Sequence, residues 1–289
     1  MIPARVLGLT ALAMLAFAGN SILCRVALKD AHIDAVSFTS IRLVSGAITL
    51  WLIVRMGQRQ QAHGVEGRGN WTSALALFVY AIAFSYAYVQ LSAATGALLL
   101  FGTVQAVMIG RGLLAGEKLD RLQWAGFLLA VAGLVGLLLP GLSAPPMASA
   151  MWMISAGVAW GIYSLRGKGR GDPTQVTAGN FIRAMPMAVA VALSTLVLAG
   201  SGGFMLDTPG VLYAVASGAI TSGMGYAVWY TALPALKATQ AATVQLSVPV
   251  IAALGGVLLL GESLSWCLAL ASTAILGGIA LVILEKPKI

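Results

Sequence analysis

Charged residues are scarce in this chain of 289 residues: Asp, Glu, Lys and Arg make up 9% of it, against 59% hydrophobic residues. A water-soluble protein of this size needs a polar surface that so few charges do not provide. The composition therefore excludes a soluble enzyme or a soluble binding domain, and it predicts a chain that is solvated by lipid.

Residues that build metal, redox or nucleophilic sites are also scarce. The two cysteines, Cys24 and Cys267, have no metal-site or redox spacing, and the two histidines, His32 and His63, fall in predicted loops. No cluster of Cys, His or acidic residues lies within an apolar segment. We therefore expect a protein that is not an enzyme and that uses no metal and no cofactor.

Long apolar runs are what the chain does contain. Crossing about 30 Å of hydrocarbon takes about 20 residues of helix. Ten such segments follow one another with short breaks, at residues 6–24, 35–54, 71–91, 93–113, 122–140, 149–165, 175–199, 210–232, 239–259 and 266–284. The sequence therefore predicts an all-α membrane bundle of ten transmembrane helices.

The net charge of +8 follows the predicted membrane and does not form a nucleic-acid-binding patch. With a cytoplasmic N-terminus, thirteen Lys and Arg residues flank the cytoplasmic ends of the spans, against Arg25 and Lys29 on the other side. Cytoplasmic loops of membrane proteins carry such an excess. We expect a multi-pass protein of the plasma (inner) membrane with both termini in the cytoplasm. Its expected partners are the bilayer and a small-molecule substrate, and monomer and homo-oligomer are both open.

Short motifs recur about 141 residues apart, on either side of the connection "LPGLSAPPMAS" at 139–149. Arg25 in "ILCRVAL" matches Arg166 in "YSLRGKG", and "TSIRL" matches "NFIRA"; three further pairs follow in the same order. The chain is thereby divided into two five-helix repeats, residues 1–145 and 146–289. Since five is odd, equivalent helices cross the bilayer in opposite directions. Inverted repeats of this kind recur in secondary transporters.

The same segments carry a family resemblance. The five-plus-five layout, "GEKLDRLQWAGFLLAVAGLVGLLL" from Gly116, its counterpart "GESLSWCLALASTAILGGIALVIL" from Gly261, and "LPALKATQAATVQLSVPVIAALGGVLLLGE" from Leu233 resemble the drug/metabolite transporter superfamily, in particular its EamA-type ten-helix members. The resemblance covers essentially the whole chain. It implies a solute cavity lined chiefly by the first, third, fourth, sixth, eighth and ninth helices. One departure is that Pro249 in the ninth span has no counterpart in the fourth.

Acidic side chains are absent from the centre of every predicted span. The nine carboxylates fall in loops or at helix ends: Asp30, Asp34, Glu66, Glu117, Asp120, Asp172, Asp207, Glu262 and Glu285. Proton-driven carriers commonly use a membrane-buried acid, because it can bind and release a proton near neutral pH. The absence predicts a facilitator, or a carrier driven by its substrate's own gradient. Glu117 and Glu262 look like a family marker, and their position favours a cap or a loop lock.

An Ile-Arg pair interrupts the apolar spans at Arg42 and again at Arg183, 141 residues later. An unpaired arginine near the centre of a span costs on the order of 3 kcal/mol, so both side chains are expected to face protein or water. They could form a symmetric pair, one near each mouth, that gates the path or binds a carboxylate through bidentate hydrogen bonds. Alternatively, they are structural ties to helix-end carbonyls or to acids such as Asp34 or Asp172.

Polar and aromatic side chains are few in the spans that the resemblance assigns to the cavity. The candidates for substrate binding are Asn20, Tyr80, Tyr86, Gln105, Trp160, Tyr163, Tyr226, Gln245 and Ser247. Amides can bind amino or carboxyl groups, and aromatic walls can hold cations or apolar groups, so this lining suits zwitterionic or mixed solutes. Interfacial anchoring or helix packing is the competing explanation for the aromatic residues.

These features together predict a secondary transporter that exports amino acids or similar small metabolites by alternating access, through a pocket between the two halves. A broad-specificity drug exporter of the same fold is the first alternative. A membrane-embedded enzyme or sensor is the second. It is disfavoured because the longest polar loop, residues 55–70, is too short to form a domain.

Overall fold

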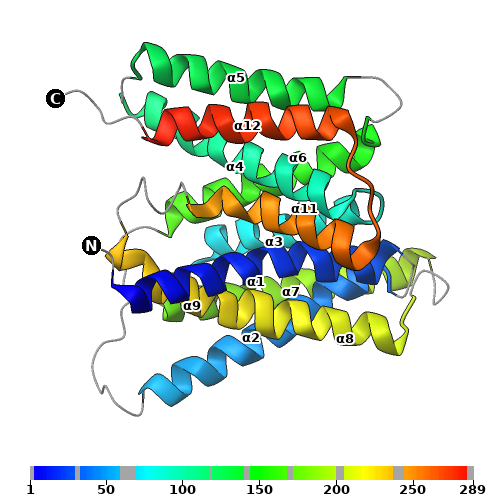
Figure 1. Cartoon of the computed structure of the whole chain (residues 1–289). Coiled ribbons are helices and arrows are strands. Elements are labelled where there is room, and N and C mark those ends of the chain that lie inside the picture. The colour runs from blue at the N-terminus through cyan, green and yellow to red at the C-terminus, as the bar shows by residue number, and fades with distance from the viewer. Residues whose placement is uncertain are drawn as a thin grey trace.

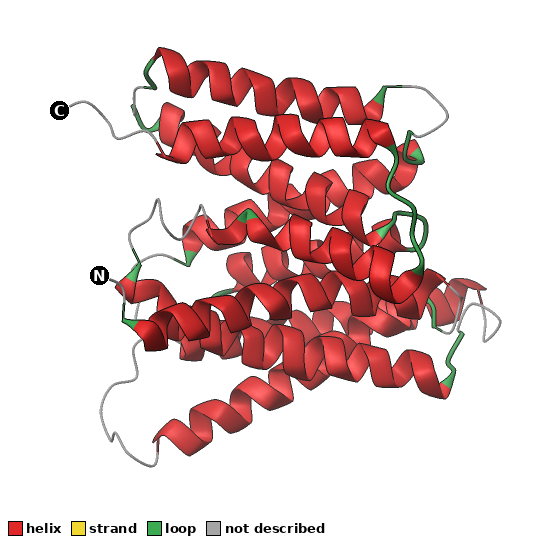
Figure 2. Ribbon diagram, viewed as in Figure 1, coloured by secondary structure: helices red, strands yellow, loops and turns green. Residues whose placement is uncertain are grey.

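The structure is a computed structural model that describes residues 3–29, 33–58, 69–116, 119–139, 144–167, 172–199, 205–236 and 244–284. Nearly all of these residues are helical and none of them belongs to a strand, apart from an isolated β-bridge between Ile33 and Leu206 (Figure 2). The predicted all-α class is therefore confirmed for the described part of the chain.

The helices fall on the predicted spans, with small shifts at their ends. They are α1 (Ala4–Lys29), α2 (Ala35–Gln58), α3 (Trp71–Tyr88), α4 (Ala93–Leu114), α5 (Arg121–Leu138), α6 (Met147–Arg166), α7 (Pro173–Ala199), α8 (Thr208–Ala216), η2 (Ser217–Met224), α9 (Gly225–Ala232), η3 (Leu233–Ala235), α11 (Ser247–Leu260) and α12 (Trp266–Leu284). Eight helical segments of the described chain are long and apolar enough to cross a membrane, with α8 through η3 counting as one, and α11 and α12 are shorter apolar helices.

The ninth span differs from its prediction at its start. It is expected over residues 239–259; residues 239–243 lie outside the described residues, residues 244 and 245 are helical, and α11 begins at Ser247 after a turn at Leu246. Pro249 lies in the first turn of α11, where its missing N–H costs no hydrogen bond. In a longer helix that N–H would have to reach the carbonyl of Gln245. The proline therefore accounts for the break at Leu246 between the helical residues 244–245 and α11.

Four aspartates stand directly before helices and therefore outside the described spans. Asp34 Oδ1 accepts hydrogen bonds from the Val36 and Ser37 amides at 3.0 and 2.9 Å. Asp120 and Asp172 cap α5 and α7 in the same way, and Asp207 directly precedes α8. A carboxylate here satisfies free N–H groups and the positive end of the helix. The acids Asp30, Glu66, Glu117 and Glu285 lie outside the described residues.

The eighth crossing contains a π-helix, η2, between α8 and α9. Its Gly218 packs directly on α2, since a Cβ there would overlap the Arg42 carbonyl oxygen and Ser45 Oγ. Short π-segments inside α-helices are often found at functional sites. This contact places η2 against the backbone of Arg42.

The pair formed by α5 and α12 runs along one edge of the bundle, next to α4 (Figure 1). The remaining helices pack around α1, α3 and α6, and α2 packs on both α7 and η2. The start of α1 and the end of α12 lie on the same side of the bundle, as an even number of crossings requires (Figure 1). The core therefore lies between α1, α3, α4, α6 and the eighth crossing.

Replacing Gly126 with Leu should destabilise the α5–α12 pair. A Cβ at Gly126 would lie 2.6 Å from the Gly278 carbonyl oxygen, and backbone cannot move aside as a side chain can. Overpacking costs about 1–3 kcal/mol, which corresponds to a fall of about 5 °C in the midpoint of thermal unfolding for a chain of this size. Heating of detergent-solubilised protein followed by gel filtration measures it.

The matched control is Gly136→Leu in the same helix, because a Cβ at Gly136 meets nothing within 4 Å. Equal unfolding midpoints for the two variants would show that the Gly126 contact does not hold the pair together.

Candidate functional site

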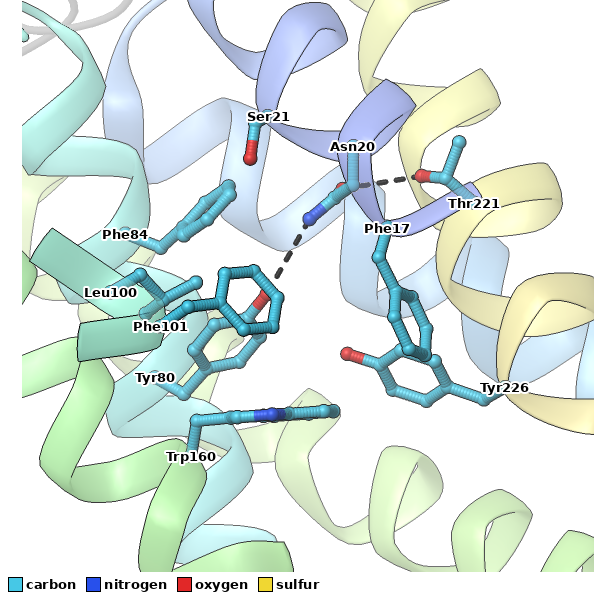
Figure 3. Close-up of a pocket in the computed structure, with 10 residues that line it drawn as sticks. All are labelled: Phe17, Asn20, Ser21, Tyr80, Phe84, Leu100, Phe101, Trp160, Thr221 and Tyr226. Carbon is cyan, nitrogen blue, oxygen red and sulfur yellow. Dashed lines mark hydrogen bonds between the residues drawn. The ribbon is translucent and has the colours of Figure 1, made fainter. Parts of the chain in front are cut away.

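A small cavity lies between the helices of both halves of the chain. Ten side chains line it, from α1, α3, α4, α6, η2 and α9: Phe17, Asn20, Ser21, Tyr80, Phe84, Leu100, Phe101, Trp160, Thr221 and Tyr226 (Figure 3). The volume open to the centre of a water molecule is about 20 Å³, which is room for about one water. The site is therefore closed around a space far smaller than a metabolite.

Aromatic rings form most of the cavity wall. The Trp160 ring lies 4.8 Å from that of Tyr80 and 5.2 Å from that of Tyr226, measured between centroids (Figure 3). Phe17 meets Tyr226 edge to face at 5.8 Å, and Phe84 lies 5.3 Å from Tyr80. Such a wall can hold an apolar group by burial, or a cation over the ring faces.

Asn20 on α1 is the centre of the polar side of the cavity. Its Oδ1 accepts hydrogen bonds from Ser217 Oγ at 2.7 Å and from Thr221 Oγ1 at 3.2 Å. Its Nδ2 donates to Tyr80 Oη at 3.4 Å (Figure 3). The amide thus joins α1 to η2 and α3 through neutral groups, and buried amides need such partners.

Arg42 lies in the interior of the bundle, which corrects its predicted place near a mouth. The side chain is 2% exposed. Its Nε donates to Ser222 Oγ at 3.2 Å and its Nη2 to Tyr80 Oη at 3.2 Å. The guanidinium also lies over the Phe84 ring at 5.1 Å. Neither Asp34 nor a helix-end carbonyl is its partner, because hydroxyls and ring faces on α3 and η2 lie within reach.

Arg183 does not mirror Arg42. Its Nη1 donates to the Gly179 carbonyl of its own helix at 2.9 Å, and the residue is half-buried. Pro186 lies one turn further along α7. The predicted symmetric pair of arginines is therefore not present in this conformation, although both residues keep equivalent sequence positions.

The structure brings four predicted substrate-binding residues to the cavity: Asn20, Tyr80, Trp160 and Tyr226. Tyr86 is not among them. It is 38% exposed and stacks on Trp152 at 5.3 Å. On an α-helix a residue two positions beyond Phe84 points to the opposite side, so Tyr86 faces outward while Tyr80 and Phe84 face the cavity. Tyr226 follows the wide turns of η2, which change the face of residues after them; α3 has no such segment.

The other predicted binding residues do not line the cavity. Gln105 is buried on α4, one turn beyond Phe101. Tyr163 stacks on Trp160 at 5.5 Å and accepts a hydrogen bond from Asn180 Nδ2 at 3.4 Å. Gln245 precedes α11 and Ser247 is the first residue of α11, where its Oγ donates to the Val244 carbonyl. No α11 residue is among those that line the cavity, which differs from the lining that the resemblance implies.

Several lining residues were not predicted, notably Phe17, Phe84, Leu100, Phe101 and Thr221. Apolar and aromatic residues in a span carry no sign of which way they face, because lipid and protein interior are equally apolar. Thr221 had a usable signal, since it lies one turn from Ser217 in an apolar span. Within the described residues, no group of three or more His, Cys, Asp or Glu side chains could hold a metal ion.

Two polar clusters tie opposite ends of α3 to its neighbours. At its C-terminal end, Arg25 Nε pairs with Glu262 Oε1 at 3.1 Å, and Arg25 Nη1 donates to the Tyr88 and Val89 carbonyls. Glu262 Oε2 accepts from the Ala93 amide at 2.8 Å, at the start of α4. The predicted role of Glu262 as a cap and loop lock is therefore confirmed.

At the N-terminal end of α3, Arg166 is the central residue. Its Nη2 donates to Thr72 Oγ1 at 2.6 Å and its Nε to Ser73 Oγ at 3.3 Å. Asn180 Oδ1 accepts from the Asn70 amide at 2.9 Å, which holds α7 to the same end. Arg25 and Arg166, which lie 141 residues apart in the sequence, thus bond polar groups at opposite ends of α3. Glu117, the predicted counterpart of Glu262, lies outside the described residues.

Known proteins are similar to this chain in sequence or in fold. The family model of the EamA-like transporter family matches residues 5–139 and again residues 147–284. An uncharacterized protein of Pseudomonas aeruginosa is 58% identical over 98% of this chain and 96% of its own length. An uncharacterized transporter of Archaeoglobus fulgidus is 26% identical over 94% and 95% of the two chains.

A solved crystal structure of a protein that is 19% identical aligns with a TM-score of 0.64, over 98% of this chain and 99% of the other. At that identity the alignment supports the fold alone. The two matches of the family model together cover nearly the whole sequence. The chain therefore belongs to the EamA-like transporter family.

Proposed function

We propose that this protein is a secondary transporter of the plasma (inner) membrane that exports amino acids or similar small metabolites by alternating access. The observation that carries the proposal is the closed cavity between the helices, with neutral polar groups on one side and aromatic rings on the others. Small-molecule sites typically combine an apolar wall with a few placed polar groups. Amino acids, which carry both charged groups and an organic side chain, fit a site of this kind.

Pairwise helix packing supports two inverted repeats, residues 1–145 and 146–289. The excess of Lys and Arg on one side of the predicted spans supports placing both termini in the cytoplasm. Helices that are equivalent in the two halves pack against each other, namely α2 on α7, α4 on α11 and α5 on α12. A two-fold axis in the membrane plane produces such self-paired contacts, and it is the axis expected of inverted repeats. The separate matches of the family model to the two halves point the same way.

We propose that the polar clusters at the two ends of α3, around Arg25 and around Arg166, act as the two gates of the transport path. With both in place, the cavity between them holds about one water. Opening toward one side requires the hydrogen bonds and the ion pair at that end to break while those at the other end persist. Two gates at matching positions of inverted repeats can exchange their states in turn.

The described carboxylates all lie outside the spans, so we propose facilitated transport that is not coupled to protons. Arginine cannot serve in their place, because it stays protonated at every working pH. A broad-specificity drug exporter is the second candidate, and the aromatic wall around the cavity favours it. The two candidates differ in whether hydrophobic cations compete with amino acids.

Counterflow in proteoliposomes tests the proposal. Purified protein should exchange labelled amino acids or related metabolites, and an imposed pH gradient at fixed membrane potential should not change their accumulation. Exchange of hydrophobic cations alone would favour the drug exporter. Accumulation that follows the pH gradient would contradict the facilitative mechanism.

Replacing Trp160 with Ala should reduce counterflow about tenfold. The substitution removes the ring that contacts both Tyr80 and Tyr226, and contacts of this kind contribute on the order of 1.4 kcal/mol, or a factor of ten. Trp152→Ala is the matched control on the same helix, since Trp152 is 45% exposed and lies outside the cavity wall. Equal loss in both variants would remove Trp160 from the transport site.

Weakening the Arg25–Glu262 gate should make the cavity accessible from outside the cell. In a protein with Cys24→Ala, Cys267→Ala and Ser21→Cys, Glu262→Gln should raise the rate of labelling at position 21 by a membrane-impermeant maleimide several-fold. The reason is that the substitution keeps a hydrogen-bond acceptor for the Ala93 amide but removes the charge that pairs with Arg25.

Asp120→Asn is the control for this measurement, because Asp120 caps α5 and has no contact with Arg25. Unchanged labelling in Glu262→Gln would contradict the gate. Faster labelling from the cytoplasmic side only would contradict the proposed orientation.

A further inference from the structure

Arg42 is a buried cation whose described partners are all neutral. It bonds the hydroxyls of Ser222 and Tyr80 and lies over the rings of Tyr80 and Phe84, at 5.3 and 5.1 Å. Arg25, by contrast, pairs with the carboxylate of Glu262. Hydroxyls and ring faces compensate a positive charge less completely than a carboxylate does.

One nitrogen of the Arg42 side chain has no partner. Nη1 is buried and makes no hydrogen bond, while Nε and Nη2 each make one. Buried donors are nearly always satisfied in proteins, so an unsatisfied one needs an explanation. Structural anchoring explains Nε and Nη2 but leaves Nη1 unaccounted for.

The guanidinium lies directly behind the cavity wall. Tyr80 Oη accepts from Arg42 Nη2 at 3.2 Å and from Asn20 Nδ2 at 3.4 Å, and Tyr80, Phe84 and Asn20 all line the cavity. Two donors thus converge on one oxygen at the edge of the cavity. An anionic oxygen that took the place of that hydroxyl would meet the same two donors, and the free Nη1 would offer a third.

The remaining wall determines what else such a ligand carries. Beyond Asn20 and Tyr80 the cavity is lined largely by apolar and aromatic groups, including Phe17, Phe101 and Trp160. If a ligand placed its carboxylate beside Arg42, the rest of the ligand would therefore lie against the aromatic rings of the cavity wall. The geometry favours a small carboxylate with an apolar or aromatic substituent.

We propose that Arg42 is the anion anchor of the transport site and that the protein selects solutes bearing a carboxylate, which it holds by a bidentate contact after the Tyr80 hydroxyl moves aside. This inference rests on the proposed transport function and specifies its substrate class. Arg183, which bonds a carbonyl of its own helix, has no part in it.

The test compares matched solutes in the proteoliposome assay. They are L-leucine, L-phenylalanine, the amides of both, 4-methylpentanoate and 3-phenylpropionate. The wild-type protein should transport the carboxylates at least tenfold better than the amides. Arg42→Gln should reduce carboxylate transport about tenfold or more and leave amide transport unchanged, so that the carboxylate-to-amide ratio falls toward one. Arg42→Lys should give an intermediate ratio, because lysine keeps the positive charge but cannot donate two parallel hydrogen bonds to a carboxylate as the guanidinium does.

The ratio separates recognition from folding, since a variant with less folded protein loses transport of every solute equally. Arg55→Gln is the matched control: the same substitution on the same helix, at an exposed residue that lies over Trp51. It should keep the wild-type ratio. Sensitivity of the ratio to Arg42→Gln but not to Arg55→Gln supports the anchor.

Three results would overturn the inference. A ratio that Arg42→Gln leaves unchanged would make Arg42 a structural residue whose Nη1 binds water only. Wild-type transport of amides as fast as carboxylates, or of cations alone, would remove carboxylate selection and leave the transport function standing. Failure to transport these six solutes would exclude apolar carboxylates, and failure with every solute of the wider panel would overturn the proposed function as well.

Discussion

The hydrogen bonds that meet at Asn20 and Tyr80 hold together helices that lipid does not drive together. Lipid tails are as apolar as leucine, so association of helices in a membrane depends on close packing and on polar contacts. Asn20 links α1 to Ser217 and Thr221 of η2 and to Tyr80 of α3, and Tyr80 links onward to Arg42 of α2. Helices from both halves of the chain therefore meet at one small polar centre, and the cavity is formed at that centre.

Glycine contacts set the distances around this centre. Gly218 lets η2 rest on the backbone of α2, which places Ser222 beside Arg42. Gly126 and Gly278 bring α5 and α12 into backbone contact at the edge of the bundle, away from the cavity. Contacts of this kind leave no room for adjustment. The α5–α12 pair is thus suited to be a fixed frame at the edge of the bundle, whereas the helices around the cavity combine such contacts, as at Gly218, with side-chain hydrogen bonds that can exchange partners.

The scarcity of polar groups also constrains how a solute is bound. Asn20 Oδ1 already accepts two hydrogen bonds, and Tyr80 Oη already accepts two. A polar solute must take over some of these bonds, because the groups that make them are already engaged and Arg42 Nη1, which has no partner, lies behind the wall. Binding and opening are coupled in such a site, since the bonds that the solute replaces are those that join the helices.

The apolar runs, their length and the placement of acids were enough to predict the helices and their order. The hydrocarbon core demands about 20 apolar residues for each crossing, and this requirement is visible in any sequence that meets it. Asp34, Asp120, Asp172 and Asp207 were expected outside the spans for the same reason, and each directly precedes a helix. Glu262 was expected to lock a loop, and it does so through Arg25 and the Ala93 amide.

The rotation of each helix about its own axis was decided by the tertiary structure alone. In a soluble protein the apolar stripe marks the buried face, but a span surrounded by lipid is apolar on every side, so the sequence does not mark the face that turns inward. Tyr80 therefore could not be told from Tyr86, nor Arg42 from Arg183, although in each pair the first reaches the cavity or its wall and the second lies away from it. That the chain crosses the membrane repeatedly follows from the hydropathy and the length of its segments, both of which can be read before any helix is placed. Which few polar and aromatic side chains meet at the centre depended on helix rotation and on the π-helix in the eighth crossing, and both arise only when the helices pack.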